Sequence, residues 1–221
     1  MKSPFSPLYL FLFMGLLLWI VFSINLGLIT LTFERLGLNP DSALILLLTS
    51  LLGSAINLPL LTLKALPASD GVERTEYGLL RRPPIPFTGR TRVVVNVGGC
   101  LIPVLFSVYL LRQAAIPPWR VAAATAIVSA VSFLLSRPIP GIGIGMPMLV
   151  APLAAAAAAI WLGGEYRAPL AYISGSWGVL IGADLLRLKD IRRMRAPIAS
   201  IGGAGTFDGI FITGLVAVLL S

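Results

Sequence analysis

The sequence contains no histidine and only one cysteine, Cys100. The absence of histidine excludes Ser-His and Cys-His nucleophile pairs, imidazole proton shuttles and His-ligated zinc or iron. A single cysteine excludes an internal disulfide and any metal site built from several thiolates. We therefore expect no metal and no cofactor. Any chemistry must come from carboxylate, basic, hydroxyl or amide side chains.

Charge is also scarce. Only 12% of the 221 residues are charged, 57% are hydrophobic and the mean hydropathy is +0.93. A soluble domain is about a quarter charged, so the composition indicates an integral membrane protein that contacts membrane lipid. The apolar segments leave no room for a separate soluble domain, and we expect one membrane domain over residues 1–221. The net charge of +8 is attributed to basic loops on the cytoplasmic side and not to nucleic-acid binding.

The apolar runs predict an all-α, polytopic membrane bundle of about seven transmembrane helices. The first run is too long for a signal peptide and no A-x-A-like site follows it, so we expect an uncleaved span. One long polar loop, rich in proline and arginine, separates the second span from the third at about residues 64–92. The expected spans are approximately 8–33, 42–63, 93–111, 121–135, 148–162, 169–186 and a last one that ends at Ser221.

Lysine and arginine are distributed unevenly between alternate loops. With the N-terminus inside, thirteen of these residues fall on the cytoplasmic side and four fall outside. Cytoplasmic loops of membrane proteins carry the excess of positive charge. We therefore expect a multi-pass protein of the cytoplasmic (inner) membrane with a cytoplasmic N-terminus and an external C-terminus.

Two carboxylates lie within apolar segments, Asp184 in GVLIGADLLRL and Asp208 in GTFDGIF. A carboxylate deep in a membrane helix costs roughly 2.5–3.5 kcal/mol and usually faces the bundle interior or a watery cavity. The helical rise places Asp184 about 22 Å beyond Pro169, and Asp208 about 20 Å before the C-terminus. Both are thus expected at similar depth on consecutive antiparallel helices, which are usually neighbours.

Glycine spacing suggests how these two helices would meet. Gly178 and Gly182 precede Asp184, and Gly205 and Gly209 flank Asp208. Small residues four apart allow helix backbones to approach closely in lipid, which would bring the carboxylates together. Such a pair would share one proton and titrate as a unit, as an aspartic-protease dyad does.

A structural interpretation of each carboxylate stays open. In this interpretation Asp184, three residues before Arg187, extends to the cytoplasmic interface. Asp208 follows a glycine-rich turn, where a helix N-terminus favours a negative charge.

The segment RPIPGIGIGMPMLVAP is expected to be irregular near residues 137–147, because its prolines and glycines disfavour a continuous helix. Its non-helical backbone would either bind an extended peptide substrate through Gly141, Gly143 and Pro147, coordinate a cation, or form an ordinary cytoplasmic turn. Asn57 and Asn96 are amides in apolar context, better suited to joining helices than to binding a ligand.

The stretches VNVGGCLIP, PGIGIGMP, SGSWGVLIGADLL and SIGGAGTFDGIF resemble the DUF1614 family of uncharacterised prokaryotic membrane proteins. The chain also resembles, more weakly, the GxGD intramembrane aspartyl proteases: presenilin, signal peptide peptidase and prepilin peptidase. That resemblance implies catalytic roles for Asp184 and Asp208 and substrate binding near Gly205. The sequence departs from it, since two residues separate Gly205 from Asp208 and no Pro-Ala-Leu segment follows.

Together these features favour an intramembrane aspartyl endopeptidase that acts on a membrane peptide or protein, with Asp184 and Asp208 as its dyad. Two alternatives remain: a proton- or cation-coupled transporter that uses the same aspartates, and a scaffold in which they are structural.

Overall fold

The computed structural model of the protein describes residues 28–64, 89–139, 143–194, 196–203 and 209–221, together with Gly15 and Leu18. Most of these residues are helical. The α-helices are α2 (Leu28–Arg35), α3 (Pro40–Gly53), α4 (Ile102–Ala114), α5 (Pro118–Leu135), α6 (Val150–Leu162), α7 (Arg167–Val179), α8 (Leu188–Met194) and α9 (Gly209–Leu220). Two π-helical turns, η1 (Val97–Leu101) and η3 (Leu180–Leu185), adjoin α4 and α7, and a 3-10 turn, η2 (Gly164–Tyr166), precedes α7.

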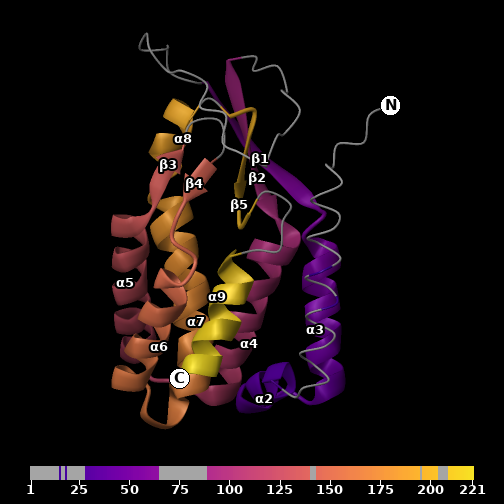
Figure 1. The fold of residues 1–221 in the computed structure, drawn as a ribbon, viewed down its shortest axis with the longest axis vertical. Coiled ribbons are helices and arrows are strands. Elements are labelled where there is room, and N and C mark those ends of the chain that lie inside the picture. The colour runs from indigo at the N-terminus through magenta and orange to yellow at the C-terminus, as the bar shows by residue number, and fades with distance from the viewer. Residues whose placement is uncertain are drawn as a thin grey trace.

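The long helices lie side by side in a bundle, and the strands and α8 gather at one end of it (Figure 1). We call this the sheet end, and the end that carries α2 and the C-terminus the opposite end. Helix α7 occupies the centre, in contact with α4, α5, α6 and α9. Tyr172 on α7 is fully buried, and its ring meets Phe106 of α4 edge-on at 4.9 Å between centroids.

The expectation of an all-α fold is wrong for part of the chain, because the described residues include two sheets. In the larger sheet, β1 (Asn57–Lys64) pairs antiparallel with β2 (Arg90–Asn96), which pairs parallel with β5 (Ile198–Ile201). In the smaller one, β3 (Arg137–Ile139) and β4 (Gly143–Gly145) form an antiparallel pair. None of the described residues from 137 to 147 is helical, as predicted, but residues 137–139 and 143–145 form a regular antiparallel pair where an irregular segment was expected.

The larger sheet interrupts segments that were expected to be continuous membrane helices. The second expected span, 42–63, is helical only to Gly53 and then becomes β1. Pro59 explains part of the change, since it has no N–H for a helical hydrogen bond and sits at a bulge of an edge strand. The third expected span begins as β2, where three consecutive valines, Val93 to Val95, favour a strand.

Two helical segments of the described chain are long and apolar enough to cross a membrane, Val97–Ala114 and Pro118–Leu135. Pro40–Gly53 and Val150–Leu162 are also apolar but shorter. The number of about seven spans is thus not established by helix length, and the expected first span lies mainly outside the described residues.

Helix α7 packs against α5 and α9 through different glycines, which corrects one expectation. Gly178 and Gly182 face α5, where a Cβ on Gly178 would lie 2.5 Å from the Val128 Cβ and one on Gly182 would overlap the Ser129 carbonyl oxygen. Contact with α9 involves Gly175 and Gly214. Helices α7 and α9 are neighbours as predicted, but Gly178 and Gly182 do not join them.

Arginine side chains bind helix C-termini at the opposite end of the bundle. Arg120 donates to the Gly163 carbonyl after α6 at 3.0 Å, and Arg35 donates to the Val218 carbonyl in α9 at 3.4 Å. The last carbonyls of a helix lack intrahelical partners and carry its partial negative charge, so a guanidinium there supplies both the missing hydrogen-bond donors and a compensating positive charge.

Candidate functional site

Asp184 lies where α7 leaves its regular geometry. The chain continues from α7 into the π turn η3, which contains Asp184 as its fifth residue. Single π turns inside helices occur frequently at functional sites, because the wider turn redirects side chains. The Asp184 side chain is half-buried, and its Oδ2 accepts a hydrogen bond from the Gly202 backbone N–H at 3.0 Å. This bond ties the end of η3 to the end of β5.

Gly202 also contacts the second π turn, η1. Its φ of +83° is a conformation that favours glycine. A Cβ on this residue would lie 2.6 Å from the Cys100 Cβ and 2.9 Å from the Cys100 nitrogen. The turn after β5 is therefore held between η1 on one side and the Asp184 carboxylate on the other. Two π turns far apart in sequence meet at one glycine.

An amide network fixes the position of η1. Asn96 is 1% exposed and caps this turn, with its Oδ1 accepting from the Gly99 N–H at 2.8 Å. Its Nδ2 donates to the Ser54 carbonyl at 2.7 Å and to Asn57 Oδ1 at 3.2 Å. Asn57 Oδ1 also accepts from Ser200 Oγ at 3.1 Å. The two predicted amides thus bind each other across β1 and β2, and Asn96 also links the C-cap of α3, Ser54, to η1, where the next helical segment begins.

The first turn of α9 shares an apolar cluster with the end of α7 and with Ala183. Ile210 belongs to one apolar cluster with Val179, Ala183 and Ala151. Ala183 directly precedes Asp184, and Ile210 follows the undescribed residues 204–208 by two positions. The chain therefore leaves the Asp184 carboxylate at Gly202 and returns at Ile210 to the apolar cluster that contains Ala183.

The β3–β4 hairpin reaches the same place. Ile144 and Met146 are partly buried against the cluster that contains Ala183 and Ile210. Gly143 begins β4 opposite Ile139, and Pro147 follows this strand and is exposed. The proline- and glycine-rich segment, predicted as part of the site, is thus a neighbour of the residues beside Asp184.

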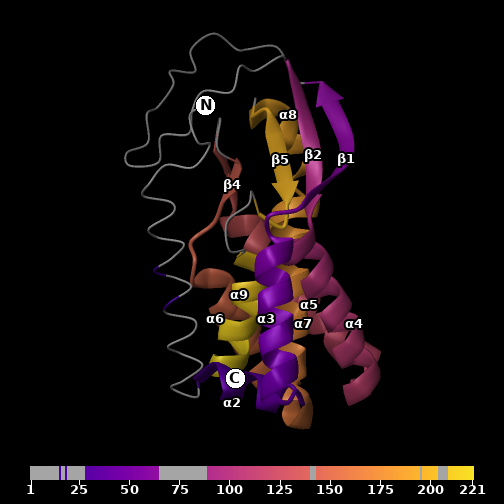
Figure 2. The same ribbon diagram turned by 90° about the vertical axis from the view of Figure 1, so that its right-hand side faces the viewer.

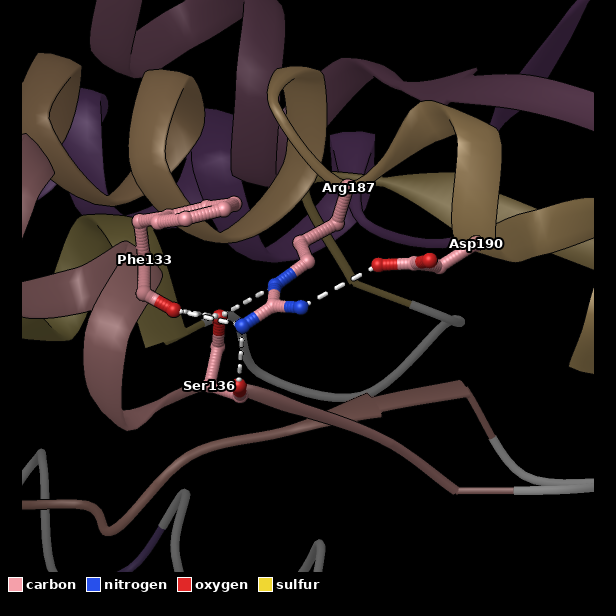
Figure 3. A network of polar contacts seen from close by, with 4 residues as sticks. All are labelled: Phe133, Ser136, Arg187 and Asp190. Carbon is pink, nitrogen blue, oxygen red and sulfur yellow. Dashed lines mark hydrogen bonds and ion pairs between the residues drawn. The ribbon is translucent and has the colours of Figure 1, made fainter.

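Arg187 is not the partner of Asp184, although it is only three residues away. Figure 3 shows its guanidinium against the end of α5, where Nη2 donates to the carbonyls of Phe133 at 2.7 Å and Ser136 at 2.8 Å. Its Nη1 forms an ion pair with Asp190 at 3.2 Å. The guanidinium carbon also lies 4.3 Å from the centre of the Phe133 ring. Arg187 therefore caps α5, and Asp184 has no ion pair with any basic side chain in the described part of the chain.

Several predicted site residues cannot be placed. Asp208, Gly205 and Gly141 lie outside the described residues, so their roles stay predictions. Among the residues that are described, no group of three or more His, Cys, Asp or Glu side chains could hold a metal ion.

Sequence reasoning missed Ser200, Gly202 and Gly98 as parts of the site. Gly98 packs so closely on α3 that a Cβ would overlap the Ser50 carbonyl oxygen, and Ser50 Oγ donates to the Gly98 carbonyl at 2.8 Å. The signal was present in the paired glycines of VNVGGC and SIGGAG, which mark close backbone approach. The partner of each pair depends on the strand pairing, which was not foreseen.

Comparison with known proteins gives one family. No curated protein and no solved structure matches this chain. The model of a family described as "Protein of unknown function (DUF1614)" matches residues 51–220, which include α4 to α9, both sheets and every described residue of the candidate site. The chain belongs to the DUF1614 family.

Proposed function

We propose that the chain is a multi-pass membrane protein of about seven spans and that it acts as an intramembrane aspartyl protease with Asp184 and Asp208 as its dyad. The observation that carries this proposal is that one flank of the undescribed segment 204–208 binds the Asp184 carboxylate and the other flank shares an apolar cluster with Ala183. Gly202 donates to the Asp184 carboxylate at 3.0 Å, and Ile210 packs in one cluster with Ala183. A carboxylate six residues after Gly202 and two before Ile210 would be close to Asp184.

The distribution of charge supports the membrane orientation. Among the described side chains, the sheet end carries seven lysines and arginines and two acids, whereas the opposite end carries four arginines and three acids. The excess at the sheet end favours its location in the cytoplasm. A chain that alternates through α3 to α9 then has its C-terminus outside, as the loop counts also predict.

The chemistry requires one ionised and one protonated carboxylate. Asp184 is suited to be the ionised member of this pair, because no basic side chain in the described part of the chain forms an ion pair with it and a backbone N–H fixes its orientation. One carboxylate would remove a proton from water while the other protonates the carbonyl oxygen of the scissile peptide bond. The hairpin β3–β4 would supply extended backbone for the substrate beside this pair, with Gly141, Gly143 and Pro147 near the bound peptide.

The test uses purified protein reconstituted in lipid with a labelled transmembrane peptide. Asp184→Asn and Asp208→Asn should each abolish cleavage, because either change removes the acid–base pair. Asp190→Asn is the matched control, since Asp190 pairs with Arg187 and lies outside the proposed dyad. This variant should cleave like the parent. Cleavage by either dyad variant at the parental rate would refute the assignment.

A second function, proton- or cation-coupled transport, is favoured by the buried hydroxyls of α5. Thr125, Ser129 and Ser132 lie on one face of this helix and have no hydrogen-bond partner among the described residues. Unsatisfied hydroxyls inside a membrane bundle are suited to transient contacts with a moving ion or water. Ion flux in liposomes that is lost in Asp184→Asn, without any peptide product, would select transport. If the parent protein shows neither activity, both functions are refuted and the aspartates have a structural role.

A further inference from the structure

The strand pair β1–β2 changes from apolar to basic along its length. At its bundle-proximal part Leu58 pairs with Val95 and Leu61 with Val93. At its far part Thr62 pairs with Arg92 and Lys64 with Arg90. Figure 2 shows this pair extending beyond the helices at the sheet end. The polarity thus changes along the direction that leads out of the bundle.

The apolar part of β1 faces outward. Leu58 and Leu60 are 46% and 58% exposed, far more than an ordinary strand in a folded core allows, and Ile56, which directly precedes β1, is 52% exposed. Helix α3 has 14 residues and spans about 21 Å, so an apolar layer of about 30 Å extends roughly 9 Å beyond it. That distance corresponds to about three residues of extended chain. Counted from Gly53, these three residues end at Ile56, so the boundary of the apolar layer falls at the start of β1, next to Ile56 and Leu58.

The basic part of the pair lies farther out, on the water side of this boundary. We call Lys64, Arg90, Arg92 and Arg192 the basic cluster; all four are exposed. Arg192 reaches it from α8, with its Nε donating to the Lys64 carbonyl at 3.1 Å. The headgroup layer adds about 5–7 Å on each side, and long basic side chains extend into it from nearby backbone.

The basic cluster lacks an intramolecular counter-charge in the described chain. Lys64 stands directly opposite Arg90 in the ladder, an arrangement that destabilises a strand pair unless an anion lies between the two charges. No described acidic side chain forms an ion pair with any of the four residues. The only ion pair among described residues joins Arg187 to Asp190.

We propose that the basic cluster binds the phosphate groups of anionic lipids in the cytoplasmic leaflet, while the exposed apolar residues of β1 contact the acyl chains beneath. The proposal rests on the membrane placement given above and is independent of any protease activity. Each basic residue near an anionic surface strengthens binding, by about fivefold for a single charge. The surface would orient the sheet, and with it the β5 turn that holds Asp184, at the membrane boundary.

The test is lipid binding measured by native mass spectrometry on detergent-purified protein with added phosphatidylglycerol or phosphatidylcholine. The parent should prefer phosphatidylglycerol, and the double variant Lys64→Gln/Arg92→Gln should weaken that binding by about 25-fold. The charge-conserving variant Lys64→Arg/Arg92→Lys should keep the preference. Arg112→Gln/Arg167→Gln, which removes two cations from the opposite end, is the matched control and should bind like the parent.

Three results would overturn the proposal. The first is equal affinity of the parent for the two lipids, and the second is an equal loss in the control double variant. The third is displacement of phosphatidylglycerol by inorganic phosphate alone, which would identify a site for soluble anions. None of these measurements uses peptide cleavage, so a failed lipid proposal and a failed protease assignment are distinguishable.

Discussion

Gly182→Ala should destabilise the protein, because Gly182 in η3 packs directly on the backbone of α5. A Cβ there would overlap the Ser129 carbonyl oxygen and lie 2.9 Å from the Ser132 Cβ. The first of these atoms is backbone and cannot move without shifting α5. Overpacking of this kind costs about 1–3 kcal/mol, and we expect the upper end of the range because no side chain can yield.

Gly182→Ala also has a stabilising contribution, from helix propensity. Alanine is about 1 kcal/mol better than glycine in a helix, so the expected net loss for Gly182→Ala is about 2 kcal/mol. For a chain of this length that loss corresponds to a melting temperature lower by about 4–8 °C.

Gly175→Ala on the same helix is the matched control. A Cβ at Gly175 would meet Ala155 and Gly214 at 3.4 Å and Thr213 at 3.5 Å, which is ordinary contact distance. Only the helix-propensity term then remains, and we expect a stability equal to the parent or higher by up to about 1 kcal/mol. Thermal unfolding of both variants in one detergent measures the difference. If Gly182→Ala melts with or above the parent, or if both variants lose the same stability, the close packing of α7 on α5 is refuted.

Three further predictions concern the connections at the sheet end, each measured by thermal unfolding in the same detergent. Arg187→Gln should lower the free energy of unfolding by about 1.5–3 kcal/mol, because it removes charged hydrogen bonds to the α5 carbonyls. Arg187→Lys should recover only part of that loss. Full recovery by lysine would contradict the role of the planar guanidinium. Gly202→Ala should cost about 1–3 kcal/mol through its φ of +83°, and a neutral result would show that the β5 turn adopts another conformation. Asn96→Ala should lower the free energy of unfolding by about 1–3 kcal/mol, since it leaves buried backbone groups unsatisfied. Asn57→Ala should lower it less, because Asn57 is exposed. Equal losses in the two variants would refute this ranking.

The composition of the chain was sufficient to predict a mostly helical protein but not its strands. Hydropathy treats residues 42–63 as one apolar run, and the run does continue, as helix α3 and then as the exposed strand β1. A helix forms its backbone hydrogen bonds within itself, whereas a strand needs a second strand to pair with. The strand that pairs with β1 lies far along the sequence, beyond the long polar stretch. Pro59 and the valines of β2 were local evidence for the strands, but their pairing is a contact between distant parts of the chain.

The glycines of α7 show how a correct observation led to a wrong contact. Gly178 and Gly182 do mark a close helix interface, as their spacing predicts, yet spacing alone does not identify which neighbour provides the other side.

The geometry of the helix contains the missing information. Asp184 is two residues after Gly182 in η3, which is about half a helical turn, so the glycine face and the carboxylate point in nearly opposite directions. If α9 were packed on the glycine face, Asp184 would be turned away from it. With that face on α5, the carboxylate is free to reach Gly202, whose chain leads into α9. The glycine pair Gly178 and Gly182 therefore does not join α7 to α9; by packing on α5 it leaves Asp184 directed toward Gly202, six residues before Asp208 in the sequence.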